Sequence, residues 1–170
     1  MCSAGLAFLV VALFGAAQEA RAAGPWYVNA ATGDDGNDCL SAATPCATVA
    51  AAIDLAGSGD VINIAPGTYI ENLYVSGKDL HFAGASAQKT ILDGGGGGRV
   101  LEILSADATL SDLTVQNGWN DDNRGGGGIY IQNGDLTIIN AVLRDNVDEG
   151  LAGGALRANG LFAGDTMVLT

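Results

Sequence analysis

The sequence predicts an all-β solenoid, a parallel β-helix in which each coil stacks on the one before it. Three observations predict this fold. Segments of about 27 residues repeat along the chain, short runs alternate apolar with polar residues, and Gly, Asn and Asp separate those runs. A period of this length is typical of stacked repeats, and an alternation of period two is typical of strands.

The repeat is clearest over three segments, 100–118, 128–146 and 155–170. The first two align without gaps at an offset of 28, and the third follows at an offset of 27, then 26 after one residue is lost in a turn. The aligned positions are Leu101/Ile103 with Ile129/Ile131 and Leu156/Ala158, Asp107 with Asp135, Leu110 with Ile138, and Val115 with Leu143 and Leu169. Each repeat has room for three short strands with turns between them, which is one coil of a parallel β-helix.

Similar runs lie upstream of these repeats. They cover residues 61–64, 73–75, 80–82 and 90–92, separated by Pro66-Gly67, Ser76-Gly77 and the glycines of 94–98. A leucine-rich repeat has a similar period, but its L-x-x-L-x-L framework and helical side are absent from the sequence. A chain of hairpins would need regular two-residue turns, which are also absent. No Lys-Ser/Thr pair follows residues 94–98, so they predict a flexible turn and not a phosphate loop.

Composition excludes several classes of protein. The 170 residues carry a formal net charge of −12, 48% are hydrophobic, 15% are charged and 26 are Gly. The apolar content is too high for a disordered or collagenous chain, and the acidic balance argues against a nucleic-acid partner. A single histidine, His81, excludes a multi-histidine metal site. It lies between Leu80 and Phe82, which are expected to face inward, so His81 is expected to face solvent.

The N-terminus predicts export. An apolar run over residues 6–17 is too short to span a bilayer comfortably, and an A-x-A cleavage site follows at residues 20–22. We therefore expect a signal peptide over residues 1–22, a secreted or cell-surface location, and no transmembrane span in the mature chain. An uncleaved anchor or a buried helix is the alternative. The mature chain divides into an N-terminal cap segment, residues 23–60, and β-helix coils, residues 61–170.

The cap segment contains a cysteine pair and a helix. Outside the cytoplasm, Cys39 and Cys46 are most simply a disulfide, since half of a zinc site would lack two further ligands. Residues 47–56 place Val49, Ile53 and Ala56 on one helical face, with Thr48 or Thr44 as the N-cap and Gly57 as the end. A short amphipathic helix of this kind would cover the first coil.

Residues 26–75 resemble the N-terminal entry of secreted right-handed parallel β-helix proteins of the pectate-lyase-like superfamily. The resemblance rests on 26–29 (WYVN), 33–38 (GDDGND), 44–49 (TPCATV), 51–53 (AAI), 65–69 (APGTY) and Glu71. Residues 125–146 and 153–160 are similar to polymorphic outer-membrane-protein repeats, through GGGI, L-x-x-N and GGAL. The resemblance implies a right-handed coil. It leaves the activity open, because the fold carries lyases, hydrolases, epimerases, adhesins and secreted passengers.

Two loops hold candidate site residues. Asp34, Asp35 and Asp38 could bind calcium, but turn chemistry in a loop pinned by the disulfide is the favoured interpretation. The second loop holds a tryptophan and charged residues that could form a ligand site: Trp119, Asp121, Asp122 and Arg124. An exposed Trp can stack on a sugar ring, and carboxylates with an Arg also belong to calcium-dependent polysaccharide lyases. A solvated turn is the simpler interpretation of this second loop.

The repeats place Glu102, Tyr130 and Arg157 in one outward-facing column. Side chains in such a column touch, because adjacent strands lie about 4.8 Å apart. The column predicts cross-strand stabilisation, with a sugar-binding ladder as the alternative.

We expect an exported scaffold that adheres or binds carbohydrate, with a polysaccharide or a cell-surface glycan as partner and with no cofactor except the calcium considered above. One alternative is the front part of a polysaccharide lyase or hydrolase whose catalytic coils lie beyond residue 170, and another is a structural stalk. The chain ends in a strand with no polar cap after it, so we also expect self-association through the open C-terminal coil, with Leu161, Phe162 and Leu169 at that end.

Overall fold

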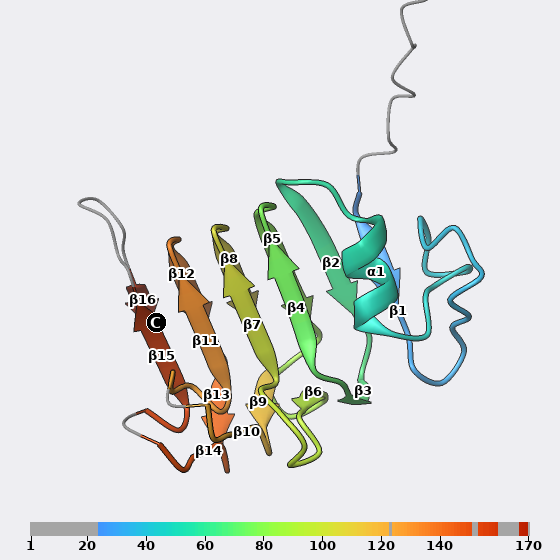
Figure 1. Cartoon of the computed structure of the whole chain (residues 1–170). Helices are drawn as coiled ribbons and strands as arrows, with labels where there is room; N and C mark the ends of the chain where they lie inside the picture. The colour runs from blue at the N-terminus through green and yellow to red at the C-terminus, as the bar shows by residue number, and fades with distance from the viewer. Residues whose placement is uncertain (1–23, 123, 151–152, 160–166, 170) are drawn as a thin grey trace, which may run out of the picture.

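The computed structural model describes residues 24–122, 124–150, 153–159 and 167–169. In these residues the secondary structure is mostly short strands in parallel sheets, with one helix, so the predicted all-β class is confirmed (Figure 1). In chain order the elements are β1 (Trp26–Val28), α1 (Val49–Leu55), β2 (Asp60–Ile64), β3 (Gly67–Ile70), β4 (Leu73–Ser76), β5 (Leu80–Gly84), β6 (Thr90–Asp93), β7 (Leu101–Leu104), β8 (Ala108–Ser111), β9 (Thr114–Gln116), β10 (Trp119–Asn120), β11 (Ile129–Gln132), β12 (Leu136–Ile139), β13 (Val142–Arg144), β14 (Val147–Asp148), β15 (Leu156–Asn159) and β16 (Met167–Leu169).

Within the described ranges, the strands form three larger parallel sheets and one two-stranded pair. Sheet A has the order β1-β2-β5-β8-β12-β16, sheet B has β3-β6-β9-β13 and sheet C has β4-β7-β11-β15, while β10 pairs with β14. From β3 onward the chain visits sheets B, C and A in turn. Each strand therefore pairs with strands that lie one repeat before or after it, and not with its neighbours in sequence.

The register confirms the offset of 28. Leu101 pairs with Ile129, Leu110 with Ile138 and Val115 with Leu143. The corners between strands repeat with the same offset. The residues with a positive φ at these corners are Ser105 and Asn133, Asp112 and Asn140, and Asn117 and Asp145. Asn and Asp tolerate the left-handed conformation better than most residues, which is why they recur at these corners.

The last strand corrects the alignment. Leu169 pairs with Ile138, an offset of 31, so β16 belongs to sheet A, and the prediction that Leu169 takes the place of Leu143 is wrong. Residues 160–166 separate β15 from β16, where only residues 133–135 separate β11 from β12. Extra residues between strands change the sequence offset without changing which strands pair. A search for apolar matches could not detect this longer link.

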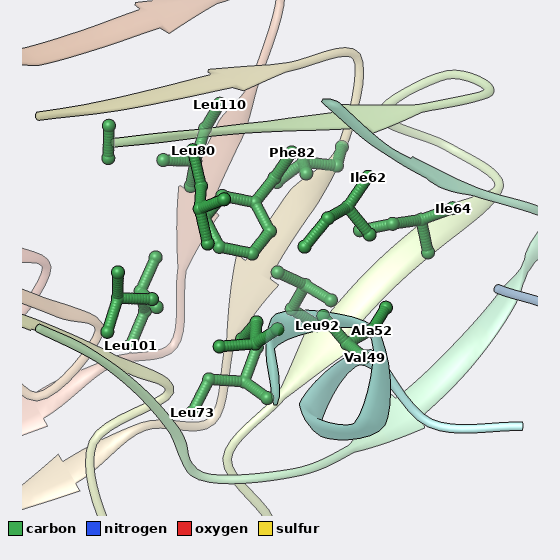
Figure 2. Close-up of a cluster of buried hydrophobic side chains, with 14 of the residues drawn as sticks. Val49, Ala52, Ile62, Ile64, Leu73, Leu80, Phe82, Leu92, Leu101 and Leu110 are labelled. Carbon is green, nitrogen blue, oxygen red and sulfur yellow. The ribbon is translucent and has the colours of Figure 1, made fainter. Parts of the chain in front are cut away.

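The core lies between the three sheets. Buried side chains from all three point toward one another, among them Leu80 and Phe82 from sheet A, Leu92 from sheet B and Leu101 from sheet C (Figure 2). Each fully buried apolar side chain of this size contributes about 1.5–3 kcal/mol relative to an exposed one. Strands such as β4 and β12 alternate more buried with less buried residues, as the period of two requires, whereas β11 is buried at three successive positions.

Helix α1 covers one end of this core. The helix packs against β1, β2 and β4 and buries Val49, Ala52 and Ile53 (Figure 2). Ala56 is also buried, so the predicted amphipathic helix is confirmed, although it ends at Leu55 with Ala56 as its C-cap.

Carboxylates and a hydroxyl satisfy the N-terminus of α1. Thr48 is the N-cap, and its Oγ1 accepts the N–H of Ala51 at 3.1 Å. Glu71, which lies between β3 and β4, accepts the N–H groups of Val49 and Ala50, both at 2.9 Å. The opposite end is met by a cation, because the Lys78 ammonium donates to the carbonyls of Ile53 and Ala56. The negative charge of Glu71 lies at the positive end of the helix dipole and the positive charge of Lys78 at its negative end, so both charges stabilise the helix.

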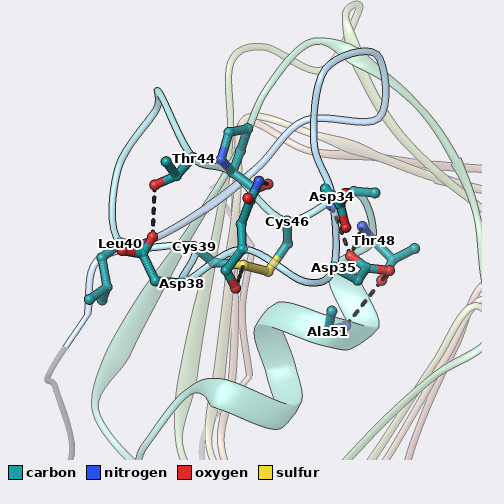
Figure 3. The surroundings of a disulfide bond; sticks show 12 residues. Asp34, Asp35, Asp38, Cys39, Leu40, Thr44, Cys46, Thr48 and Ala51 are labelled. Carbon is teal, nitrogen blue, oxygen red and sulfur yellow. Dashed lines mark hydrogen bonds between the residues drawn. A yellow bond between two sulfur atoms is a disulfide. The ribbon is translucent and has the colours of Figure 1, made fainter.

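The Cys39–Cys46 disulfide is confirmed, and both cysteines are buried (Figure 3). The loop it closes pairs with β1. The N–H of Tyr27 donates to the Cys39 carbonyl at 2.9 Å, and the N–H of Cys46 donates to the Tyr27 carbonyl at 2.8 Å. The loop therefore covers the edge of sheet A, which would otherwise present unpaired backbone groups.

Several predictions concern residues outside this description. The predicted signal peptide, residues 1–22, lies outside the described residues, as do Leu161 and Phe162 at the predicted open end. In the part of the chain that is described, no helix has the length and apolarity needed to cross a membrane.

We predict that Glu71→Ala lowers the free energy of unfolding by about 1–2 kcal/mol, because two N–H groups at the helix N-terminus lose their acceptor. Urea denaturation followed by circular dichroism measures the change. Glu149→Ala is the control, since Glu149 is an exposed glutamate remote from the helix in sequence. Equal unfolding midpoints for the two variants would contradict this role of Glu71.

Candidate functional site

The predicted column lies on sheet C. Glu102 on β7 pairs with Tyr130 on β11, and Tyr130 pairs with Arg157 on β15. The column continues on the other side, where Tyr74 of β4 pairs with Glu102. Tyr74 and Arg157 are exposed, whereas Glu102 is half-buried. The register thus confirms that the three predicted residues are neighbours and adds a fourth.

Tyr130 does not present an open ring on this column. Its side chain is 1% exposed. The guanidinium carbons of Arg99 and Arg124 lie 5.0 Å and 5.2 Å from the ring centroid. The phenol donates to Oε1 of Gln132 at 3.1 Å. The two cations cover the ring, so Tyr130 offers no exposed ring for a sugar to stack on, and sugar binding by the column stays a prediction. The alternation along a strand predicts on which side of the sheet a side chain lies. It does not predict whether residues from outside the strand, here Arg99 and Arg124, cover that side chain.

Asp122 holds the two arginines together. It accepts from Arg99 Nη1 at 2.9 Å and from Arg99 Nη2 at 2.5 Å. It also accepts from Arg124 Nε at 2.6 Å, while Arg124 Nη1 donates to Glu102 at 2.7 Å. Arg99 donates further to the Gly125 carbonyl at 3.1 Å. These bonds hold Asp122, Arg124 and the Gly125 carbonyl next to β7 and β11.

The charges of this cluster balance. Hydrogen bonds from the Arg99 side chain are the main reason that the pKa of Asp122 lies well below its usual value. Hydrogen bonds to Asp122 and Glu102 raise the pKa of Arg124. Asp122 is therefore ionised at neutral pH, and we assign the cluster to fixing the loop and not to proton transfer.

Of the predicted loop residues, Asp122 and Arg124 lie at the column, and both are exposed, as Asp121 is. The sequence reasoning missed Arg99, whose side chain is 9% exposed. Its position three residues before Glu102, next to the predicted column, is the feature that could have identified it.

Trp119 lies in a different hollow. It is half-buried on β10 and pairs with Val147 of β14. A groove of about 400 Å³ is lined by Gly95, Gly96, Asn117, Gly118, Trp119, Asp145 and Val147. The charged cluster around Tyr130 does not line this groove, so the structure divides the predicted loop site into two separate places.

A buried carboxylate orients Asn117 in this groove. Burial acts to raise the pKa of Asp93, but hydrogen bonds from Gln116, Gly95 and Asn117 lower it below its usual value. The Asn117 side chain donates to Asp93 at 2.8 Å. Asp93 therefore stays charged and holds the amide in place.

The three candidate calcium ligands, Asp34, Asp35 and Asp38, accept hydrogen bonds from backbone and hydroxyl groups of the cap segment. Asp34 accepts from the N–H of Gly36, Asp35 from the N–H groups of Ala47 and Thr48, and Asp38 from the N–H of Leu40 and the hydroxyl of Thr44 (Figure 3). The Thr44 hydroxyl is the main reason that the pKa of Asp38 is lowered. The bonds of Asp34 and Asp38 to the N–H two residues on are the turn chemistry that the sequence favoured, whereas Asp35 bonds to the more distant residues Ala47 and Thr48. Among the described residues, no group of three or more His, Cys, Asp or Glu side chains is arranged to hold a metal ion. Calcium binding at this loop stays a prediction.

His81 is less open than predicted. It is half-buried, and its Nε2 lies 2.8 Å from the hydroxyl of Ser111. Its neighbours Leu80 and Phe82 face the core as predicted.

We predict that Asp122→Asn weakens the pH dependence of stability below pH 4. A carboxylate with a lowered pKa stabilises the fold above its unfolded-state pKa, about 3.9, and this contribution is lost as the pH falls through the folded-state pKa. Because the group is partly exposed, about 1 kcal/mol is expected at pH 7. Thermal unfolding between pH 2 and 7 measures the difference. Asp121→Asn is the matched control, and similar profiles for the two variants would contradict the assignment.

Comparisons of the chain with protein-family models, curated proteins and solved structures found no match. The resemblance to the pectate-lyase-like superfamily therefore stays a prediction.

Proposed function

We propose that this chain is part of an exported right-handed parallel β-helix that binds carbohydrate, either a polysaccharide or a cell-surface glycan. The rotation of the chain through sheets B, C and A, in register at 28 residues, supports a β-helix. The strong preference of parallel crossover connections for the right hand supports that part of the proposal. The buried disulfide supports an oxidising compartment, in agreement with the predicted signal peptide.

The groove beside Trp119 is the observation that carries the binding proposal. A half-buried indole presents a broad apolar face with one polar N–H, and this combination suits the apolar face and hydroxyl rim of a sugar ring. The glycines of the groove have no side chains to block the approach of a ring. Asn117 and Asp145 supply amide and carboxylate groups for the hydroxyls.

Charge and position favour a glycan over other partners. The chain carries −12 net charge, which disfavours polyanions. The groove lies next to the short β10-β14 pair, where the chain leaves the three large sheets between β9 and β11. Loops that extend from a rigid scaffold are common places for binding residues.

We predict that the mature protein binds at least one glycan on an array, and that Trp119→Ala raises the Kd at least tenfold. The variant loses the stacking and burial of the indole ring. A loss of about 1.4 kcal/mol of binding free energy corresponds to a tenfold rise in the Kd. Titration calorimetry with the best glycan measures the change. Tyr74→Ala is the control, because Tyr74 is an aromatic residue with 56% exposure on sheet C. Loss of binding in Tyr74→Ala with no effect of Trp119→Ala would place the binding site on sheet C instead and contradict the proposal.

A further inference from the structure

We infer a second ligand site, on the outer face of sheet A beside the disulfide loop, that takes one neutral sugar ring or a neutral polar molecule of that size. This site does not involve Trp119 and lies in a hollow of about 260 Å³. It does not depend on the function proposed above.

Three neighbouring strands supply one side of the hollow. Tyr27 of β1 pairs with Asn63 of β2, which pairs with Ala83 of β5, and all three residues line the hollow. The row therefore places an aromatic ring, an amide and a methyl group side by side. The small side chain of Ala83 leaves space that a larger residue would fill.

The disulfide loop supplies the facing wall. Ala42 and Pro45 line the hollow, and both lie between Cys39 and Cys46. Inside the loop, the N–H of Thr44 donates to the Ser41 carbonyl at 3.1 Å. The disulfide and this backbone hydrogen bond therefore order the loop in the absence of a ligand.

The loop also fixes the strand that carries the aromatic ring. The N–H and the carbonyl of Tyr27 bond to Cys39 and Cys46, and the N–H of Asn29 donates to the Cys46 carbonyl at 2.8 Å. A site that is ordered in advance loses little conformational entropy on binding. The disulfide therefore preorganises the site as well as the fold.

Two amides leave complementary groups for a ligand. The Asn63 side chain uses its Nδ2 to donate to the Trp26 carbonyl at 3.4 Å, which leaves its Oδ1 as an acceptor. Asn29 uses its Oδ1 to accept from the N–H of Ala31 at 2.9 Å, which leaves its Nδ2 as a donor. A hydroxyl both donates and accepts, so a ring bearing hydroxyls matches this pair.

Size and charge define the class of ligand. The hollow is slightly smaller than the range of about 300–1,000 Å³ found for drug-sized ligands, so one ring fits and an extended molecule does not. Among the described residues that line it, none is Asp, Glu, Lys, Arg or His. A charged ligand would lose hydration without gaining a counter-charge, so a neutral ligand is favoured. The Tyr27 ring offers an apolar surface for stacking.

Methyl glucoside and N-acetylglucosamine are the probes, titrated into the ¹⁵N-labelled mature protein and followed by amide chemical shifts. We expect saturable shifts with at least one probe, centred on Tyr27, Asn63 and Ala83. Ala83→Leu fills the hollow and should raise the Kd at least tenfold. Ala50→Leu is the matched control, because Ala50 is exposed on α1, and it should leave the Kd unchanged.

A second variant separates loss of the site from loss of the fold. Asn63→Ala removes the free acceptor and keeps the space, so it should weaken binding severalfold while the remaining amide shifts stay native. Trp119→Ala should leave these shifts unaffected, even where it abolishes glycan binding at the other groove. Absence of saturable shifts with both probes, shifts centred on residues 117–119 instead, or an unchanged Kd in Ala83→Leu would each overturn the inference.

Discussion

Parallel pairing in constant register is the constraint on which the rest of this structure depends. Each strand donates and accepts backbone hydrogen bonds with the strand one repeat away, so Leu101, Ile129 and Leu156 must occupy equivalent places. A slip of one residue would turn every inward side chain of a strand toward solvent. The apolar stripe of each sheet and the left-handed corners at Ser105 and Asn133 therefore repeat together.

The same constraint determines where variation is allowed. Residues added between strands leave the pairing intact, as between β15 and β16, and the excursion between β9 and β11 carries both Trp119 and Asp122. A stack also has ends, where the ladder must be closed. At the N-terminal end the disulfide loop pairs with β1 and α1 lies over the core, with Glu71 and Lys78 at its two termini. Closing this end creates the hollow beside Tyr27, so the disulfide loop that stabilises the end also forms one wall of the inferred second ligand site.

The sequence predicted the features that follow from local periodicity. The offset of 28, the Glu102–Tyr130–Arg157 column, the disulfide and the capping helix all depend on residues whose spacing can be counted. Features that depend on distant segments were missed. Strand β3 was not anticipated, because Pro66-Gly67 looked like a turn, and the cover over Tyr130 comes from Arg99 and Arg124, which lie outside its strand. The register of Leu169 depends on the length of a link that no apolar pattern records.

Engineered disulfides across sheet A test the register most directly. Thr109 of β8 pairs with Thr137 of β12, and both face outward and are half-buried. Paired residues of adjacent strands lie within the Cα separation of about 4.4–6.8 Å that a disulfide requires, while diagonal residues lie about 7–8 Å apart. The account predicts that Thr109→Cys with Thr137→Cys oxidises to one new disulfide in the folded protein, detected by peptide mapping, and that Thr109→Cys with Ile139→Cys does not. Preferential cross-linking of the second pair would contradict the stacking of repeats at an offset of 28.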